Sequence, residues 1–185
     1  MNIQEYQKEA FKRLNPLISN NKIECMNYAC LGIIEETGEV IAELRKALYK
    51  GNFHEKELDK REITKECGDL IWYLFLVCKN NDINIEEIEE RKLEDDNIGS
   101  RDFLVKKSLE IGARSSGIIG EILNQQTQQE KSDILKKKIQ EQLEAIKELL
   151  SCLEVDFEEA LKLNLRKTNR RYDEDGKAKK ITESR

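Results

Sequence analysis

Two acidic motifs hold the side chains best suited to chemistry in this sequence. The first has the pattern EExxE and contains Glu35, Glu36 and Glu39, and the second has the pattern ExxD and contains Glu66 and Asp69. Residues three apart lie on one face of a helix, so each motif places two carboxylates side by side. Like charges placed this way repel one another unless a cation lies between them. The two motifs are therefore a candidate metal site.

Carboxylates without a neighbouring His or Cys suit a hard cation such as Mg²⁺ or Mn²⁺. Such ions share oxygens with substrate phosphates, so the motifs indicate phosphoryl polarisation and activation of a bound water. Spacing alone leaves a second interpretation open, because such pairs are common and usually solvated in a chain rich in Glu and Lys. Gly38 and Gly68 favour the metal site, since each costs a helix about 1 kcal/mol relative to Ala yet lies inside an acidic motif.

The elements that must position these acids are helices. Apolar residues recur every three to four positions, which predicts helices over residues 3–14, 23–50 and 55–81 and another that begins at 85–88. No segment alternates apolar and polar residues for long enough to predict a strand. The fold class is therefore predicted to be all-α. If the second and third helices pack antiparallel, their acidic faces converge.

Composition limits the remaining possibilities. A chain of 185 residues with 37% charged residues, one Pro and a net charge of -5 fits one solvated helical unit and gives no case for nucleic-acid binding. The longest apolar stretch, residues 70–78, is too short to span a membrane, and no secretory signal is expected at the N-terminus, which lacks an apolar core. The five cysteines contain no CxxC pair, which favours reduced thiols and a cytoplasmic protein over a disulfide frame or zinc site.

The acidic motifs and their surroundings resemble the MazG-like nucleoside triphosphate pyrophosphohydrolases, in the all-α superfamily that includes dimeric dUTPases and dCTP pyrophosphatases. The family pattern is EExxE, a spacer and ExxD, and here 26 residues separate the two motifs. The resemblance covers about residues 3–90 and includes the segment Gly68-Asp69-Leu70-Ile71-Trp72-Tyr73-Leu74. It implies a MazG-like helical bundle with Mg²⁺-dependent hydrolysis of NTPs or dNTPs to monophosphate and pyrophosphate. Sanitation of the nucleotide pool would be its role.

The resemblance also implies roles for individual residues. Mg²⁺, or Mn²⁺ in its place, would be coordinated by Glu36, Glu39, Glu66 and Asp69. Glu35 either orients water or a ligand or is solvated. The candidate substrate contacts are Tyr73, Lys46, Lys50, Asn164, Lys167, Arg171 and Tyr172. Each also has an interpretation without a substrate contact. Tyr73 would be a core aromatic, Lys46 and Lys50 would lie at a solvated helix end, and residues 164–172 would form an exposed basic helix. Trp72 is expected to pack in the core.

The basic tail of the family, of NxxKxxxRY type, is found here only at residues 164–172, which implies an insertion of about 70 residues before it. The insert is either a degenerate second unit or two more amphipathic helices that complete a bundle. In the first interpretation Arg114, Ser115 and Ile118 align with the EExxE acids, and Lys138 and Glu141 align with the ExxD acids. The predicted organisation is a catalytic half over 1–93, a second half over 94–163 and a basic tail over 164–185, in one compact domain.

Two antiparallel helices cannot cover both of their apolar sides, so we expect a homo-oligomer, with a homodimer favoured. The expected partner besides a second copy is a nucleoside triphosphate, with no membrane and no nucleic acid. An alternative function of another class is a non-catalytic helical module for nucleotide sensing or assembly on the same scaffold.

Overall fold

The computed structural model describes residues 1–49, 57–86, 88, 99–124, 128–173, 177 and 179, without the side chains of residues 128–131. Among these residues there is no β-strand, which confirms the all-α prediction. The helices are α1 (Ile3–Ala10), α2 (Pro16–Ser19), α3 (Lys22–Leu48), α4 (Lys60–Asn80), α5 (Arg101–Leu123), α6 (Gln128–Cys152) and α7 (Phe157–Arg171). None of the described helices is long and apolar enough to cross a membrane.

Local signals explain where the helices begin and end. The helix predicted over 3–14 ends at Ala10, a 3₁₀ turn follows over Phe11–Arg13, and Pro16 then starts α2, since its fixed φ suits the first helical position. The predicted helices over 23–50 and 55–81 are α3 and α4. The helix predicted to begin at 85–88 does not begin there, because Ile85 and Ile88 are non-helical and buried in the core, and residues 89–98 lie outside the described part of the chain.

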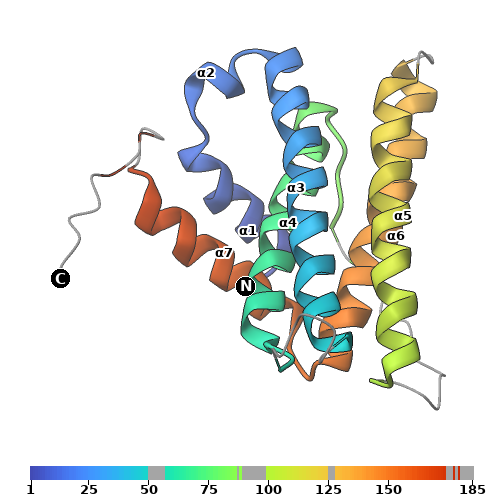
Figure 1. Cartoon of the computed structure of the whole chain (residues 1–185). Helices are drawn as coiled ribbons and strands as arrows, with labels where there is room; N and C mark the ends of the chain where they lie inside the picture. The colour runs from blue at the N-terminus through green and yellow to red at the C-terminus, as the bar shows by residue number, and fades with distance from the viewer. Residues whose placement is uncertain are drawn as a thin grey trace.

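The long helices form two antiparallel hairpins. α3 packs on α4, α5 packs on α6, and α5 lies along α3. Figure 1 shows these four helices side by side, with α1 and α7 on the far side of α4 from the second hairpin. α7 packs across α4 and contacts α1. The first hairpin is therefore covered on one side by α5 and α6 and on the other by the two ends of the chain.

A buried polar network joins the two hairpins. The hydroxyls of Thr37 and Ser115 lie 2.7 Å apart, and Nε2 of Gln142 donates to Ser115 Oγ at 3.0 Å and to the carbonyl of Ile111 at 3.2 Å. Gly112 lets α3 approach, since a Cβ there would lie 3.2 Å from Cδ1 of Ile41. Because the network is surrounded by core side chains, it fixes the register of α5 against α3.

The second hairpin carries ion pairs where an acidic site would stand in the degenerate-repeat interpretation. Arg114 donates to Glu141 Oε2 at 2.9 Å and to Glu110 Oε1 at 2.7 Å. Opposite charges therefore neutralise each other there without a metal. The division of the chain into a catalytic half, a second half and a tail stays a prediction.

Candidate functional site

Three carboxylates from the two acidic motifs converge between α3 and α4. Glu36, Glu39 and Glu66 each offer one carboxylate oxygen, and these atoms lie within 4.8 Å of one another. Their helices begin at caps that the sequence supplies, since Asn21 accepts from the amide of Glu24 at 3.2 Å and Asp59 accepts from that of Glu62 at 3.1 Å. The antiparallel packing of α3 on α4 then brings the two motifs together.

Burial makes this cluster electrostatically unfavourable on its own. Glu36 and Glu66 are 8% and 5% exposed, and Oε2 of each has no hydrogen-bond partner in the described part of the chain. Desolvation and the nearby charge of Asp69 raise the pKa of Glu36 to about 8. Desolvation also raises the pKa of Glu66, although Lys65 opposes that shift through an ion pair at 2.9 Å. Each of these two buried acids therefore keeps one oxygen without a hydrogen-bond partner, which is costly in free energy.

The donor set fits a hard divalent cation. All three converging ligand atoms are carboxylate oxygens, without a His or Cys in the group, and two of the side chains hold a buried oxygen with no hydrogen bond. Mg²⁺ and Mn²⁺ prefer such oxygens, and a bound cation would remove the repulsion between them. The residues present therefore fit the metal that the resemblance implies.

Asp69 lies next to this cluster but makes different contacts. Its Oδ1 accepts from Asn164 Nδ2 at 2.8 Å, and its Oδ2 pairs with the ammonium of Lys167. The hydroxyl of Tyr6 donates to Asn164 Oδ1 at 2.6 Å, and burial, with the charge of Asp69, raises the pKa of that tyrosine and keeps it protonated. Three elements far apart in the sequence, α1, α4 and α7, therefore meet at one acidic side chain.

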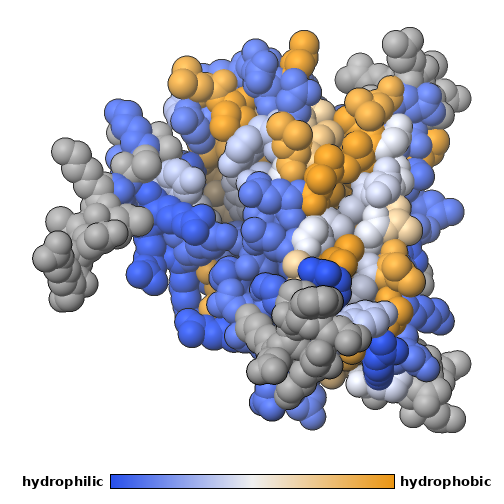
Figure 2. Space-filling view, in the orientation of Figure 1, coloured by the Kyte–Doolittle hydropathy of each residue, from blue (hydrophilic) through white to orange (hydrophobic). Residues whose placement is uncertain are grey.

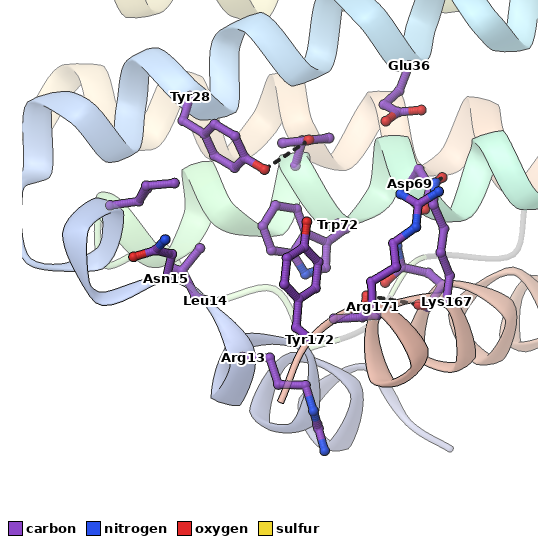
Figure 3. A pocket seen from close by; sticks show the side chains of 14 residues that line it. Arg13, Leu14, Asn15, Tyr28, Glu36, Asp69, Trp72, Lys167, Arg171 and Tyr172 are labelled. Atoms are coloured by element: carbon purple, nitrogen blue, oxygen red, sulfur yellow. Dashed lines mark hydrogen bonds and ion pairs between the residues drawn. The ribbon is translucent and has the colours of Figure 1, made fainter. Parts of the chain in front are cut away.

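A cavity of about 190 Å³ opens beside Glu36 and Asp69. Figure 3 shows these two acids at one end of the cavity, with Trp72 and Tyr172 nearer its middle. Asn164, Lys167, Arg171 and Tyr172, four of the predicted substrate contacts, line it. It combines an acidic end, basic side chains from α7 and an aromatic wall, which suits an anionic ligand with a flat ring.

Three aromatic side chains form that wall. Tyr73 also lines the cavity, its hydroxyl lies 3.4 Å from that of Tyr28, and its ring packs edge-on against Trp72 with centroids 4.9 Å apart. Gly32 makes room for Tyr73, because a Cβ there would lie 2.2 Å from the ring. Trp72, expected to pack in the core, both packs and lines the cavity.

The remaining predicted residues lie elsewhere. Glu35 is exposed on α3. Lys46 pairs with Glu43 at 2.5 Å and does not line the cavity. Lys50 lies outside the described residues.

Sequence reasoning missed several lining residues, namely Arg13, Leu14, Asn15, Ile18, Tyr28 and Thr168. Tyr28 had a signal, since it precedes Glu36 by eight residues and thus lies close to the same helix face. The lining residues before α3 carried no signal in the sequence, because only the packing of the N-terminal segment brings them close to α4.

Comparison with known families agrees with this geometry. Residues 27–94 match the family model described as the MazG nucleotide pyrophosphohydrolase domain, and this stretch includes both acidic motifs and the aromatic wall from α3 and α4. The chain gives no significant match to a curated protein or to a solved structure. The match covers just over a third of the chain and confirms the resemblance predicted from the acidic motifs. Residues 27–94 are therefore consistent with a MazG-like nucleotide pyrophosphohydrolase.

Proposed function

We propose that this protein is a Mg²⁺-dependent pyrophosphohydrolase that converts nucleoside or deoxynucleoside triphosphates to monophosphate and pyrophosphate. The observation that carries the proposal is the convergence of Glu36, Glu39 and Glu66, two of them buried with unsatisfied oxygens, beside a cavity with basic and aromatic walls. A family match over both motifs supports the same reaction. Clearance of unwanted nucleotides in the cytoplasm is the role that we propose for it.

Each part of the site would have one task. Glu36, Glu39 and Glu66 would hold the metal, and Asp69 would join them when Lys167 turns from its carboxylate to a substrate phosphate. Bound Mg²⁺ would neutralise phosphate charge and polarise the α-phosphoryl group. Lys167 and Arg171, which both line the cavity, would bind phosphate oxygens. The proton of the attacking water would pass to a carboxylate of the cluster.

The aromatic wall supports a nucleotide rather than a small phosphate. Tyr28, Trp72 and Tyr73 line the cavity, and the ring of Tyr73 packs edge-on against the other two. Flat nucleobases stack well on such side chains. The nucleobase would therefore lie on this wall while the α-phosphate lies at the carboxylates.

A turnover assay tests the proposal. The full chain is mixed with Mg²⁺ and a panel of NTPs and dNTPs, and pyrophosphate and monophosphate are measured together. We expect equal amounts of the two products and a loss of at least about a hundredfold in Glu39→Gln, because one metal ligand is removed. The matched control is Glu24→Gln, an exposed acid on the same helix. Nucleotide binding without turnover by any substrate would instead favour the non-catalytic sensing module.

We further propose a homodimer, on the strength of an uncovered apolar face. Leu31 and Ile34 on α3 are 67% and 55% exposed, and Leu109 and Leu123 on α5 are 70% and 76% exposed. Figure 2 shows hydrophobic side chains along these two helices. On α5 the exposed residues between the two leucines, Ala113, Ser116 and Gly120, are all uncharged. A second copy offers the same uncharged surface and so fits this face.

A further inference from the structure

A second, strongly basic groove lies beside the candidate site. It is formed by the beginning of α4 and the end of α7 and has a volume of about 660 Å³. Its cations are Arg61, Lys65, Arg166, Lys167, Arg170 and Arg171. Among the residues that the structure describes, Glu62 is the only acid that lines it. Such a concentration of positive charge in a chain of net charge -5 requires an explanation.

Most of this charge is not neutralised by nearby acids. Within the described residues, neither Arg61 nor Arg170 forms an ion pair. Arg166 reaches Glu159 only at 4.0 Å, the longest ion pair of the helix. Lys65 and Lys167 are the exceptions, since Lys65 pairs with Glu62 at 2.5 Å and Lys167 pairs with Asp69. The groove therefore presents arginine donors that are available to an anion, and arginine forks match phosphate oxygens.

The groove continues the cavity of the candidate site. Lys167 and Arg171 line both spaces, so the two spaces meet at these side chains. Gly68 permits this arrangement, because α7 crosses α4 there and a Cβ would lie 2.5 Å from the carbonyl oxygen of Ala160. An anion in the cavity and an anion in the groove would therefore contact the same two side chains.

The order of side chains along α4 gives the groove a direction. Arg61, Lys65, Asp69 and Trp72 follow one another at helical spacing and lie along one side of the helix. With a rise of 1.5 Å per residue, Arg61 lies about 16 Å along the axis from Trp72, with Asp69 between them. A nucleotide with its base on Trp72 and its α-phosphate at the carboxylates would direct its further phosphates toward Arg61.

We propose that this groove binds the phosphates beyond the α-phosphate, as the β- and γ-phosphates of the substrate and then as the pyrophosphate product. The proposal rests on the proposed function and adds Arg61 and Arg170 as contacts to the leaving group. In the reaction a water oxygen bonds to the α-phosphorus and the bond to the α–β bridging oxygen breaks. The pyrophosphate takes that electron pair into the groove, and the water proton passes to a carboxylate.

Direct binding of inorganic tripolyphosphate in metal-free buffer tests the groove without any turnover. Titration calorimetry compares the wild type with the double variant Arg61→Gln/Arg170→Gln. We expect the affinity of the double variant to fall by about tenfold or more, since two charge-assisted contacts are lost. The matched control is Lys136→Gln/Lys137→Gln, which removes two exposed charges from α6. Equal affinity in the double variant and the wild type, or an equal loss in the control, overturns the proposal.

Product inhibition distinguishes phosphate binding in the groove from a general effect of removing two positive charges. In the double variant we expect the inhibition constant of pyrophosphate and the KM of the triphosphate to rise by about tenfold, with inhibition by the monophosphate unchanged. A similar weakening of monophosphate inhibition contradicts the proposed order of subsites. If no nucleotide is hydrolysed but tripolyphosphate binding still depends on the two arginines, phosphate binding by the groove is supported and the proposed hydrolase activity is contradicted.

Discussion

Asn164 on α7 holds the carboxylate of Asp69 on α4, with Asn164 Nδ2 donating to Asp69 Oδ1 at 2.8 Å. The same amide accepts from the hydroxyl of Tyr6 on α1 at 2.6 Å. All three side chains are buried. An acid of the candidate site is thus positioned by two helices outside the hairpin that carries the acidic motifs.

Replacement of Asn164 by Ala should destabilise the protein. The Tyr6 hydroxyl and Asp69 Oδ1 would both lose this partner in a buried place, at a cost of about 1–3 kcal/mol for each group. We expect a lower denaturant midpoint in urea unfolding followed by circular dichroism. Asn169→Ala, an exposed change on the same helix, serves as the control and should leave the midpoint unchanged. A wild-type midpoint for Asn164→Ala would mean that the hydrogen-bonded chain contributes nothing.

The raised pKa of Glu36 predicts that the metal-free protein loses stability as pH rises. Its pKa is about 8 in the folded chain against an ordinary value of 4.5, so between these values the folded state binds the proton that the unfolded state has lost. The free energy of unfolding should therefore fall across this pH range and level off above it. Thermal unfolding in chelator measures the trend, and Glu36→Gln should weaken it.

Magnesium should show the opposite dependence. The ion needs the ionised carboxylate, so its affinity should increase with pH up to about 8, by at most about tenfold per pH unit for one proton displaced. Calorimetric titration of Mg²⁺ into the wild type and into Glu36→Gln measures this. An affinity that is independent of pH over this range would show that Glu36 is not a ligand.

The sequence predicts the acidic cluster because i, i+3 spacing fixes which helix face each carboxylate occupies. It cannot supply the partners of Asp69 in the same way, since Asn164 lies 95 residues away and only packing brings α7 to α4. Asn164 and Lys167 were found through family resemblance instead. Arg13 and Asn15 were missed because they reach the cavity through the packing of a short N-terminal segment, which has no periodic pattern.

The same limit explains the wrong helix at 85–88. The pattern of Ile and Glu there has helical spacing, yet Ile85 and Ile88 are 2% and 8% exposed in a non-helical segment. Burial of both side chains in the core contributes more free energy to folding than the weak helical preference of a short segment. Long amphipathic helices such as α3 and α4 do not share this ambiguity, because many turns repeat the signal.

The apolar face on α3 and α5 predicts that Leu109→Glu dissociates the homodimer. The substitution places a carboxylate where the leucine would be buried against a second copy, a contribution of about 1.5–3 kcal/mol for each leucine. Light scattering at micromolar concentration should give a dimer for the wild type and a monomer for Leu109→Glu, with unchanged helix content. Ser151→Glu adds the same charge at an exposed position of α6 and should remain dimeric. A wild-type protein that is monomeric in this assay contradicts the predicted interface.

The close crossing of α4 and α7 predicts that Gly68→Ala harms both stability and the site. A Cβ at this position would lie 2.5 Å from the backbone oxygen of Ala160, which cannot move without shifting α7. We expect a loss of about 1–3 kcal/mol in the free energy of unfolding, as for other overpacked sites. Because α7 carries Asn164 and Lys167, which bind the carboxylate of Asp69, its displacement should also move that carboxylate and lower the rate of hydrolysis.

Gly117→Ala is the matched control for this substitution. It also places Ala within a long helix, but the nearest atom to its Cβ would be Lys138 Nζ at 3.8 Å, an ordinary contact. It should stabilise the protein by about 0.5–1 kcal/mol, since Ala favours a helix over Gly. If α7 packs directly on α4 at Gly68, chemical denaturation should give a lower free energy of unfolding for Gly68→Ala and a higher one for Gly117→Ala. Stabilisation by both substitutions would show that the two helices can separate there at no cost.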